Sequence, residues 1–377
     1  MLSFVLVGTF ALATQAILVA PPSGPYAVSM STQSLTDESR LDPFAPLDNP
    51  HLRRVMISTF LPVDEAKTPC AGRERVPYMT PLVAEAYDEL GVALGLANET
   101  FSSLELELCV PRAQSCRRRT STSFPLVLFS PGWGNPRLLY GAMAREVASY
   151  GFAVVTIDHP YDPSFVEFPD GEVYRALDLN PDNTTQLEFL VQVRADDVSF
   201  VLSQLHQKPN ASMDLDRTIM FGHSLGGATA AVAMLQDSRI LGGINLDGML
   251  FNPALEAGLD NPFLLVGRPG HADDDSTWNP FYSGLRGQRA LLSVSGTTHG
   301  TFTDFPILID SFNLALPEEL KSLLEGELGT IEFGRVGKVI AGIVGAFADW
   351  VFDDNVGQLF PAGNATLPEV SVLAENI

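Results

Sequence analysis

The chemistry available to this chain begins with a serine between glycines, in the segment Gly222-His223-Ser224-Leu225-Gly226. A short apolar run ends where this segment starts and small residues follow it, a pattern that predicts a strand, a sharp turn and a helix. Such a turn needs glycine around the serine because a Cβ atom would clash, and it presents the hydroxyl at the start of the helix. The pattern therefore indicates Ser224 as a nucleophile and His223 as a buried packing residue beside it.

A serine hydroxyl is a weak nucleophile near neutral pH, so it needs a histidine base within hydrogen-bond reach and a carboxylate that orients the histidine. Downstream of Ser224 the sequence contains two histidines, His271 and His299. His299 follows an apolar run and the small-residue turn 295–298, as expected for a loop at the carboxyl end of a strand. We therefore predict His299 as the general base and interpret His271 as a surface histidine.

The acid of such a triad lies between the serine and the histidine in chain order when the serine follows a strand and begins a helix. Asp247 directly follows residues 243–246, the first apolar run after that helix. Asp273, Asp274 and Asp275 follow the next apolar run, 263–266. We predict Asp247 as the acid, and the three aspartates at 273–275 are the alternative.

Acyl transfer also requires N–H donors directed at the negative charge that develops on the carbonyl oxygen. The residue after the nucleophile supplies one donor, and the loop after an earlier strand supplies another. The apolar run 126–129 ends in Ser130-Pro131-Gly132-Trp133-Gly134, where the glycines allow the backbone to approach a substrate. We predict the N–H groups of Leu225 and Trp133 as the donors; the alternative is an ordinary tight turn with Trp133 in the core.

The elements that must position these residues alternate between short apolar strands and helices from Phe124 onward. Residues 54–60 predict an earlier half-buried strand closed by Pro62, and residues 80–94 predict a helix. The pattern favours an α/β-hydrolase fold, with a mostly parallel central sheet and helices on both faces. The later predicted strands are 126–129, 153–157, 218–221, 243–246, 263–266 and 290–294, and the later predicted helices are 138–150, 186–207, 228–236 and 335–352.

We predict a single domain over residues 51–377, with C-terminal helices at 315–355. An insertion at 160–186, rich in Pro, Asp and aromatic residues, is either a lid or binding loop or a glycosylated surface loop. Residues 1–20 are apolar and uncharged, which predicts a secretory signal peptide, with a membrane anchor as the alternative. Residues 21–50 have no periodicity and predict an extended N-terminal arm.

The overall charge limits the classes of partner. The 377 residues include 23 basic and 45 acidic residues, for a formal net charge of -22, and 46% are hydrophobic, which is ample for a large buried core. The excess of acidic residues disfavours binding to nucleic acid or to an anionic membrane. We therefore expect a small-molecule or lipid ester as the partner, no nucleic acid, and only transient contact with a lipid surface.

Several features favour export. The apolar N-terminus occurs together with four glycosylation sequons, which predicts a secreted, extracellular glycoprotein; their asparagines are Asn98, Asn183, Asn210 and Asn364. In an oxidising compartment the three cysteines, Cys70, Cys109 and Cys116, allow one disulfide from three possible pairs and leave one thiol. Their spacing is not that of a metal site, and acyl transfer by a serine requires neither a metal nor an organic cofactor.

Taken together, residues 129–134, 222–227, 245–248 and 299–305, with the strand at 53–63, resemble the platelet-activating-factor acetylhydrolase family (plasma and type II) of α/β-hydrolases. The resemblance spans about residues 50–310. It implies the roles given above to Asp247, His299 and Trp133, because this family takes its acid from the strand after the nucleophile helix. It also implies calcium-independent, phospholipase-A2-like removal of short or oxidised sn-2 acyl chains.

The sequence thus predicts a secreted serine esterase of lipid degradation, with substrate contacts from Trp133, Phe302 and Phe305 or, alternatively, with these aromatic residues in the core. A lipase or polyester-degrading (cutin-type) esterase of broader specificity would use the same triad. An inactive hydrolase-fold binding protein is a third interpretation, disfavoured because Ser224, Asp247 and His299 are all present.

Overall fold

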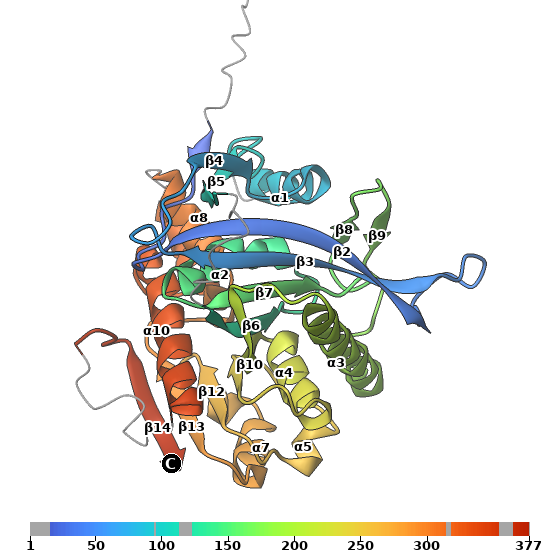
Figure 1. The fold of residues 1–377 in the computed structure, drawn as a ribbon. Coiled ribbons are helices and arrows are strands. Elements are labelled where there is room, and N and C mark those ends of the chain that lie inside the picture. The colour runs from blue at the N-terminus through green and yellow to red at the C-terminus, as the bar shows by residue number, and fades with distance from the viewer. Residues whose placement is uncertain (1–15, 94–95, 113–122, 314–317, 354–364, 377) are drawn as a thin grey trace, which may run out of the picture.

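A nine-stranded sheet forms the centre of the computed structural model, which describes residues 16–93, 96–112, 123–313, 318–353 and 365–376 (Figure 1). The strand order is β14-β13-β12-β11-β10-β6-β7-β3-β2. The six strands from β13 to β7 in this order are parallel, whereas β14, β3 and β2 are antiparallel to their neighbours. The bounds are β2 (Ala27–Leu41), β3 (Leu52–Val63), β6 (Phe124–Ser130), β7 (Ala153–Asp158), β10 (Met213–His223), β11 (Gly243–Leu246), β12 (Phe263–Gly267), β13 (Arg289–Val294) and β14 (Val370–Asn376).

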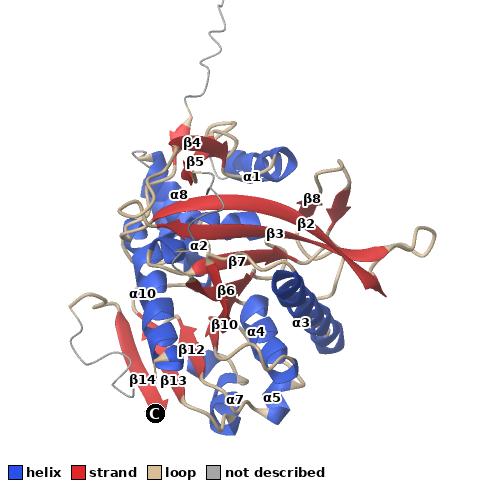
Figure 2. Cartoon of the chain, in the orientation of Figure 1, coloured by secondary structure: helices blue, strands red, loops and turns tan. Residues whose placement is uncertain are grey.

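Helices cover both faces of this sheet, as Figure 2 shows. One face packs against α2 (Gly141–Ser149), α8 (Phe305–Phe312) and α10 (Phe333–Phe352), and the other packs against α3 (Thr184–Gln207), α4 (Leu225–Gln236), α5 (Ala254–Ala257) and α7 (Trp278–Gly284). Neighbouring residues of β6 alternate between the two cores, since Val127 and Phe129 belong to the first and Leu126 and Leu128 to the second. Burial on both faces explains why these strands are continuous apolar runs.

The predicted fold class is confirmed, and all six strands predicted after residue 124 are present. The structure differs at β3, which was expected to be half-buried and to end before Pro62. This strand is buried over most of its length and continues to Val63, with Pro62 paired opposite Val28. Val55 and Ile57 belong to one core and Phe60 to the other, so both faces of β3 are covered.

The segment predicted as an N-terminal arm, residues 21–50, contains the fifteen-residue strand β2, which lies along β3 at one edge of the sheet (Figure 1). Most of its side chains after Met30 are polar and at least partly exposed. An edge strand pairs on one side only and tolerates such residues, so no apolar period marked it as a strand.

The predicted signal peptide covers residues 1–20, of which residues 1–15 lie outside the described residues. Its last part belongs to the fold, because β1 (Ile17–Leu18) pairs in parallel with β5 (Leu104–Val110) and Val19 is buried. The boundary predicted at residue 20 therefore falls beyond the start of the packed structure.

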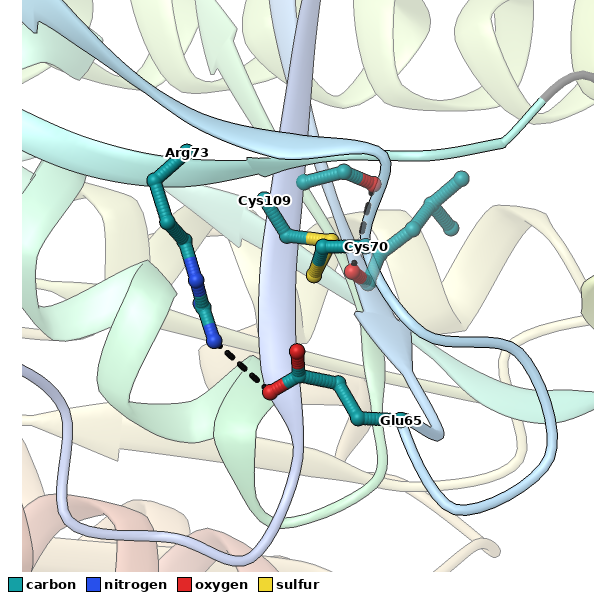
Figure 3. The surroundings of a disulfide bond; sticks show 6 residues. Glu65, Cys70, Arg73 and Cys109 are labelled. Atoms are coloured by element: carbon teal, nitrogen blue, oxygen red, sulfur yellow. Dashed lines mark hydrogen bonds and ion pairs between the residues drawn. A yellow bond between two sulfur atoms is a disulfide. The ribbon is translucent and has the colours of Figure 1, made fainter.

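A disulfide joins Cys70 to Cys109 beside a smaller sheet, where β5 lies between β1 and β4 (Gly72–Pro77). Figure 3 shows this bond next to the ion pair between Glu65 and Arg73. Cys109 pairs opposite Arg73 in the sheet, and Cys70 lies just before β4, which brings the two Cα atoms to 5.5 Å. The structure thus selects one of the three pairings, and Cys116 lies outside the described residues.

The predicted insertion at 160–186 forms a short hairpin of β8 (Phe165–Glu167) and β9 (Val173–Arg175) before α3 begins. Arg54 of β3 holds this hairpin by ion pairs of 2.7 Å to Asp170 and 2.6 Å to Glu172. The guanidinium of Arg54 also lies over the ring of Phe168, at 4.1 Å from its centroid. The insertion is therefore tied to the body of the sheet.

Two further helices are α1 (Pro81–Ala93), which follows the predicted start at Thr80-Pro81, and α9 (Glu318–Leu328), which precedes α10. The helix predicted at 335–352 is α10, which packs against α2. None of the helices in the described residues is long and apolar enough to cross a membrane. The strand β14, which was not predicted, follows α10 after residues that are not described.

Candidate active site

Ser224 lies between the last residue of β10 and the first residue of α4, with φ 54° and ψ -123°. Positive φ is unfavourable for a residue with a side chain, so the surrounding backbone must hold the turn. A Cβ atom at Gly222 would overlap the backbone of Gly226, and one at Gly226 would overlap the carbonyl oxygen of Ser130. These close approaches are the reason for the glycines in the motif, and they join the turn to the loop after β6.

Ser224, His299 and Asp247, the three residues predicted as a triad, lie together at the carboxyl edge of the parallel strands. The Oγ of Ser224 is 3.1 Å from Nε2 of His299, and Nδ1 of His299 is 2.7 Å from Oδ2 of Asp247. A carboxylate accepts the Nδ1–H proton, which leaves Nε2 free to accept the serine hydroxyl. The side chain of His299 is 52% exposed whereas that of Asp247 is fully buried, so a substrate can reach His299 but not Asp247.

Asp247 follows β11 in a turn with φ 56°, and its carboxylate is held from two directions. Oδ2 accepts from His299, and Oδ1 accepts the backbone N–H of Arg268 at 2.8 Å. Burial raises the pKa of Asp247, but contacts with His271 and His299 outweigh it and hold the pKa well below its usual range. Asp247 is therefore ionised at neutral pH.

His271 was interpreted as a surface histidine, and this is wrong: its side chain is buried against the ring of Trp278. Its Nδ1 lies 2.8 Å from Oδ1 of Asp247, an ion-pair contact whose angle falls short of a directional hydrogen bond. Its Nε2 lies 3.2 Å from Oδ2 of Asp275. One sequence signal was available, because His271 follows the strand that a parallel sheet places next to β11.

The alternative acids do not contact His299. Asp273 and Asp274 are exposed in α6 (His271–Asp274), where Asp274 forms an ion pair of 2.8 Å with Arg268. Asp275 is buried and bonds to His271. The geometry therefore favours Asp247 over the aspartates at 273–275.

His223 links the nucleophile turn to two other loops. Its Nδ1 is 2.9 Å from the hydroxyl of Tyr140, which accepts the N–H of Gly132 and the side-chain amide of Asn135, both at 3.1 Å. The hydroxyl proton is thus directed at Nδ1, and the Nε2–H of His223 donates to the carbonyl oxygen of His299 at 3.1 Å. Burial lowers the pKa of His223 to about 3, and repulsion from the imidazole of His299 when that ring is protonated acts in the same direction, so the ring of His223 is neutral. It is buried as predicted, and its hydrogen bonds were not foreseen.

The loop between β6 and η1 (Arg137–Tyr140) carries Trp133, whose backbone N–H was predicted as an oxyanion donor. The N–H groups on either side are occupied: that of Gly132 bonds to Tyr140, and that of Gly134 bonds to Asp162 at 2.8 Å. Within the described part of the chain, the N–H groups of Trp133 and Leu225 bond to no protein acceptor. Two donors thus stand free beside the serine turn, as an oxyanion site requires.

A buried ion pair between Arg194 and Asp162 holds this loop in place. Arg194 of α3 donates to the carbonyl oxygen of Pro131 at 2.7 Å and to Asp162, which in turn accepts the N–H of Gly134. Arg194 and Asp162 are both at most 1% exposed. Sequence reasoning missed this support, although a charged residue on the apolar face of a helix is a recognisable signal.

A second serine, histidine and aspartate chain lies under the same loop. Ser130 Oγ is 2.9 Å from Nε2 of His159, and Nδ1 of His159 is 3.0 Å from Asp197, which also pairs with Arg53. All four side chains are at most 1% exposed. Since no substrate can reach them, we assign this chain to holding the ends of β6 and β7 in place.

The residues that follow His299 are anchored by Asp304. Its buried carboxylate accepts the hydroxyl proton of Tyr78 at 2.5 Å and the N–H groups of Ala142 and Met143 at the start of α2. Burial raises the pKa of Asp304 to about 7, and these three donors oppose the rise. The helix α2, one of the helices that cover one face of the sheet, is thereby connected to the loop of His299.

The predicted substrate residues occupy different positions. Trp133 is half-buried on its loop, and Phe302 is buried with its ring 6.2 Å from that of His223. Phe305 lines an apolar cavity of about 370 Å³ between α1, α8 and α9. Gly300, the neighbour of His299, lines the same cavity, so the cavity lies beside the loop of His299. No cluster of side chains that could hold a metal ion occurs among the described residues.

Comparison with known proteins agrees with this geometry. The family described as platelet-activating factor acetylhydrolase, isoform II, matches residues 50–168 and 172–319. The chain belongs to this family. It is an esterase of the family, with a mixed α/β fold around a mostly parallel sheet.

Relatives and a solved structure support this placement. A probable 1-alkyl-2-acetylglycerophosphocholine esterase of Arthroderma benhamiae is 33% identical over 312 residues, which is 78% of each chain. The platelet-activating factor acetylhydrolase of Cavia porcellus is 26% identical over 230 residues, 52% of each chain. The structure of a ferulic acid esterase from Streptomyces cinnamoneus matches with a TM-score of 0.74 and 30% identity, covering 95% of this chain and 100% of that one.

Proposed function

We propose that this esterase is a secreted, calcium-independent enzyme that hydrolyses short sn-2 acyl chains of phospholipids, with Ser224, His299 and Asp247 as its catalytic residues. One observation carries the proposal: the three side chains form a continuous hydrogen-bonded chain, with distances of 3.1 Å and 2.7 Å, beside two free backbone N–H groups.

The mechanism has two steps. His299 Nε2 accepts the hydroxyl proton of Ser224 while Oγ attacks the ester carbonyl, and the N–H groups of Leu225 and Trp133 stabilise the oxyanion. The tetrahedral intermediate collapses, His299 gives the proton to the departing alcohol, and an acyl-enzyme remains. A water molecule then attacks the acyl group with His299 as base, and the carboxylic acid leaves as the proton returns to Ser224. Asp247 orients the imidazole and stabilises its charged form.

The lipid substrate is supported by the relative from Arthroderma benhamiae, whose name gives an ester of this kind. It is also supported by the apolar cavity between α1, α8 and α9, which Phe305 lines beside the loop of His299. Leu90 and Leu323, both 45% exposed, lie at this cavity. An apolar chain of the substrate, or transient contact with a lipid surface, would bury these side chains.

Export is part of the same proposal. A disulfide such as Cys70–Cys109 is typical of oxidising compartments, and the sequon residues Asn98 and Asn210 are exposed. Asn183 is half-buried and caps α3, while Asn364 lies outside the described residues. Expression with the native N-terminus tests export: the product should appear in the medium and lose mass on treatment with a glycosidase.

A second candidate is an esterase of broader specificity that includes aryl or polyester substrates. The match to the ferulic acid esterase favours it, because that structure covers 95% of this chain at 30% identity. The exposed position of His299 also leaves the approach to Ser224 open to bulky esters. An inactive binding protein is disfavoured, since the triad residues are not only present but in contact.

The test compares purified wild-type protein with Ser224→Ala and with Ser283→Ala, an exposed serine on α7 as matched control. Substrates are phosphatidylcholines with sn-2 chains from acetyl to oleoyl, ethyl ferulate and a long-chain triglyceride, with and without EDTA. We expect the highest kcat/KM on the acetyl lipid, no effect of EDTA, and activity lost only in Ser224→Ala.

Other results decide against parts of the proposal. Highest kcat/KM on ethyl ferulate would select the second candidate, and highest kcat/KM on the triglyceride would indicate a lipase. Full activity in Ser224→Ala would contradict the assigned nucleophile.

A further inference from the structure

His271 is a buried titratable residue that the mechanism above does not use. It lies on the side of Asp247 opposite to His299, with Nδ1 2.8 Å from Oδ1 of the carboxylate. Its other nitrogen lies 3.2 Å from Oδ2 of Asp275. The triad thus continues through Asp247 into a second imidazole and a second carboxylate.

The charge of His271 follows from its neighbours. A neutral imidazole has one N–H and can serve one carboxylate, whereas the imidazolium has two and serves both. Burial lowers the pKa of His271, but the carboxylates of Asp247 and Asp275 outweigh it and raise the pKa to about 9. At neutral pH the ring is therefore a cation between two anions.

Other groups near the pair do not replace this cation. The Nε of Arg268 is 4.0 Å from Oδ2 of Asp247, and its Nη1 forms an ion pair with Asp274 at 2.8 Å. From the loop of η2 (His299–Phe302), His299 contacts Oδ2 only. On the Oδ1 side, His271 is the only side chain among the described residues in an ion pair or hydrogen bond with the carboxylate.

We propose that His271 is a positioning residue of the esterase: held between Asp247 and Asp275, it fixes the carboxylate of Asp247 in the orientation that serves His299. This inference rests on the proposed function, since it requires Asp247 to act as the acid. The ring of Trp278, 4.2 Å from that of His271 between centroids, keeps the imidazole from turning away.

The first test is His271→Gln, which keeps a hydrogen-bond donor of similar length but removes the charge. We expect kcat to fall about 10-fold or more while KM stays within about twofold. The reason is that Asp247, no longer held by His271, orients His299 less well while the acyl-serine forms and is hydrolysed. His206→Gln, an exposed histidine in the last turn of α3, is the matched control and should leave both parameters unchanged.

The second test separates positioning from a general loss of structure. In a double-mutant cycle, His271→Gln should have little further effect on kcat once Asp247→Asn is present, since no carboxylate then remains to be oriented. If the two losses multiply instead, or if His271→Gln alone has the wild-type kcat, the inference is wrong.

A pH profile gives an independent readout. The kcat of the wild type should fall as the pH rises through about 9, where His271 loses its charge, and His271→Gln should show no such limb. If His271→Gln fails to fold, Asp275→Asn serves instead, and its limb should lie at lower pH than that of the wild type because one of the two anions is gone.

A limb at the same pH in the wild type and in the variant would contradict the role of His271. Loss of activity in Ser224→Ala together with normal kcat in these variants would leave the proposed function standing and reject only this inference.

Discussion

Tyr140→Phe is a sharp test of how the site is held, because the substitution removes one hydroxyl and keeps the ring. That hydroxyl is fully buried and has three partners: the N–H of Gly132, the amide of Asn135 and Nδ1 of His223. The ring itself packs against Phe129, and this contact is preserved in the variant. Any effect therefore comes from the lost hydrogen bonds.

The expected loss of stability depends on the polar groups that lose their hydrogen-bond partner. Asn135 is half-buried and can turn to water, but Gly132 N–H and Nδ1 of His223 are buried. Each unsatisfied buried group costs about 1–3 kcal/mol, and removal of the hydroxyl saves its own burial cost, so we expect unfolding to become easier by about 2–4 kcal/mol. His223 can then change tautomer and release the carbonyl of His299, which should lower kcat about 10-fold.

Urea unfolding gives the stability and steady-state kinetics give kcat, with Tyr87→Phe as the matched control. The ring of Tyr87 contacts Phe101 and Phe305, and within the described residues its hydroxyl forms no hydrogen bond. The control should stay within about 0.5 kcal/mol of the wild type. A Tyr140→Phe protein with wild-type stability and wild-type kcat would refute the assigned network.

Three further predictions concern the acid, the disulfide and a buried carboxylate. Asp247→Asn should lower kcat by about 10⁴-fold, because an amide favours the wrong tautomer of the base, whereas Asp274→Asn should have no effect in the same kinetic assay. Replacing both Cys70 and Cys109 by serine should cost about 4 kcal/mol in urea unfolding, the chain-entropy value for a sequence separation of 39. Burial raises the pKa of Asp197, but Arg53 and His159 outweigh burial and lower this pKa. The ionised carboxylate therefore stabilises the fold above the usual aspartate pKa of 3.8, and this stabilisation is lost as the pH falls below that value. The difference in Tm between wild type and Asp197→Asn should accordingly be smaller at about pH 3 than at about pH 6.

Much of the site could be predicted because its residues follow strands. In a parallel sheet the carboxyl ends of neighbouring strands meet at one edge, so Ser224 after β10 and Asp247 after β11 must lie close together. His299 follows β13 in the same way. The order of residues in the chain was therefore enough to bring these three side chains into one place.

The supporting residues could not be found in this way. Tyr140 contacts His223 across 83 residues, and Arg194 reaches the loop of Trp133 from α3. Each of these contacts depends on side-chain packing between elements that are distant in sequence, and no local period records it. His271 is the exception, because it follows β12, the strand next to β11, and the same strand order places it near Asp247. The edge strands β2 and β14 were missed for a related reason, because partly exposed strands lack the apolar run that marks β6 or β10.

The close approaches of backbone at the site explain how it is fixed before a substrate binds. A Cβ atom at Gly226 would overlap the carbonyl oxygen of Ser130, and one at Gly248 would overlap that of Ser224. The turn of Ser224 thus contacts both the loop that carries Trp133 and the loop that carries Asp247. No side chain would fit between these backbones. Oxyanion donors act best when they need no reorganisation during the reaction, so in the mechanism proposed above this contact of three backbones holds the donors in place in advance. In the same proposal, the ester is selected by the surroundings of the turn, above all by the cavity that Phe305 lines.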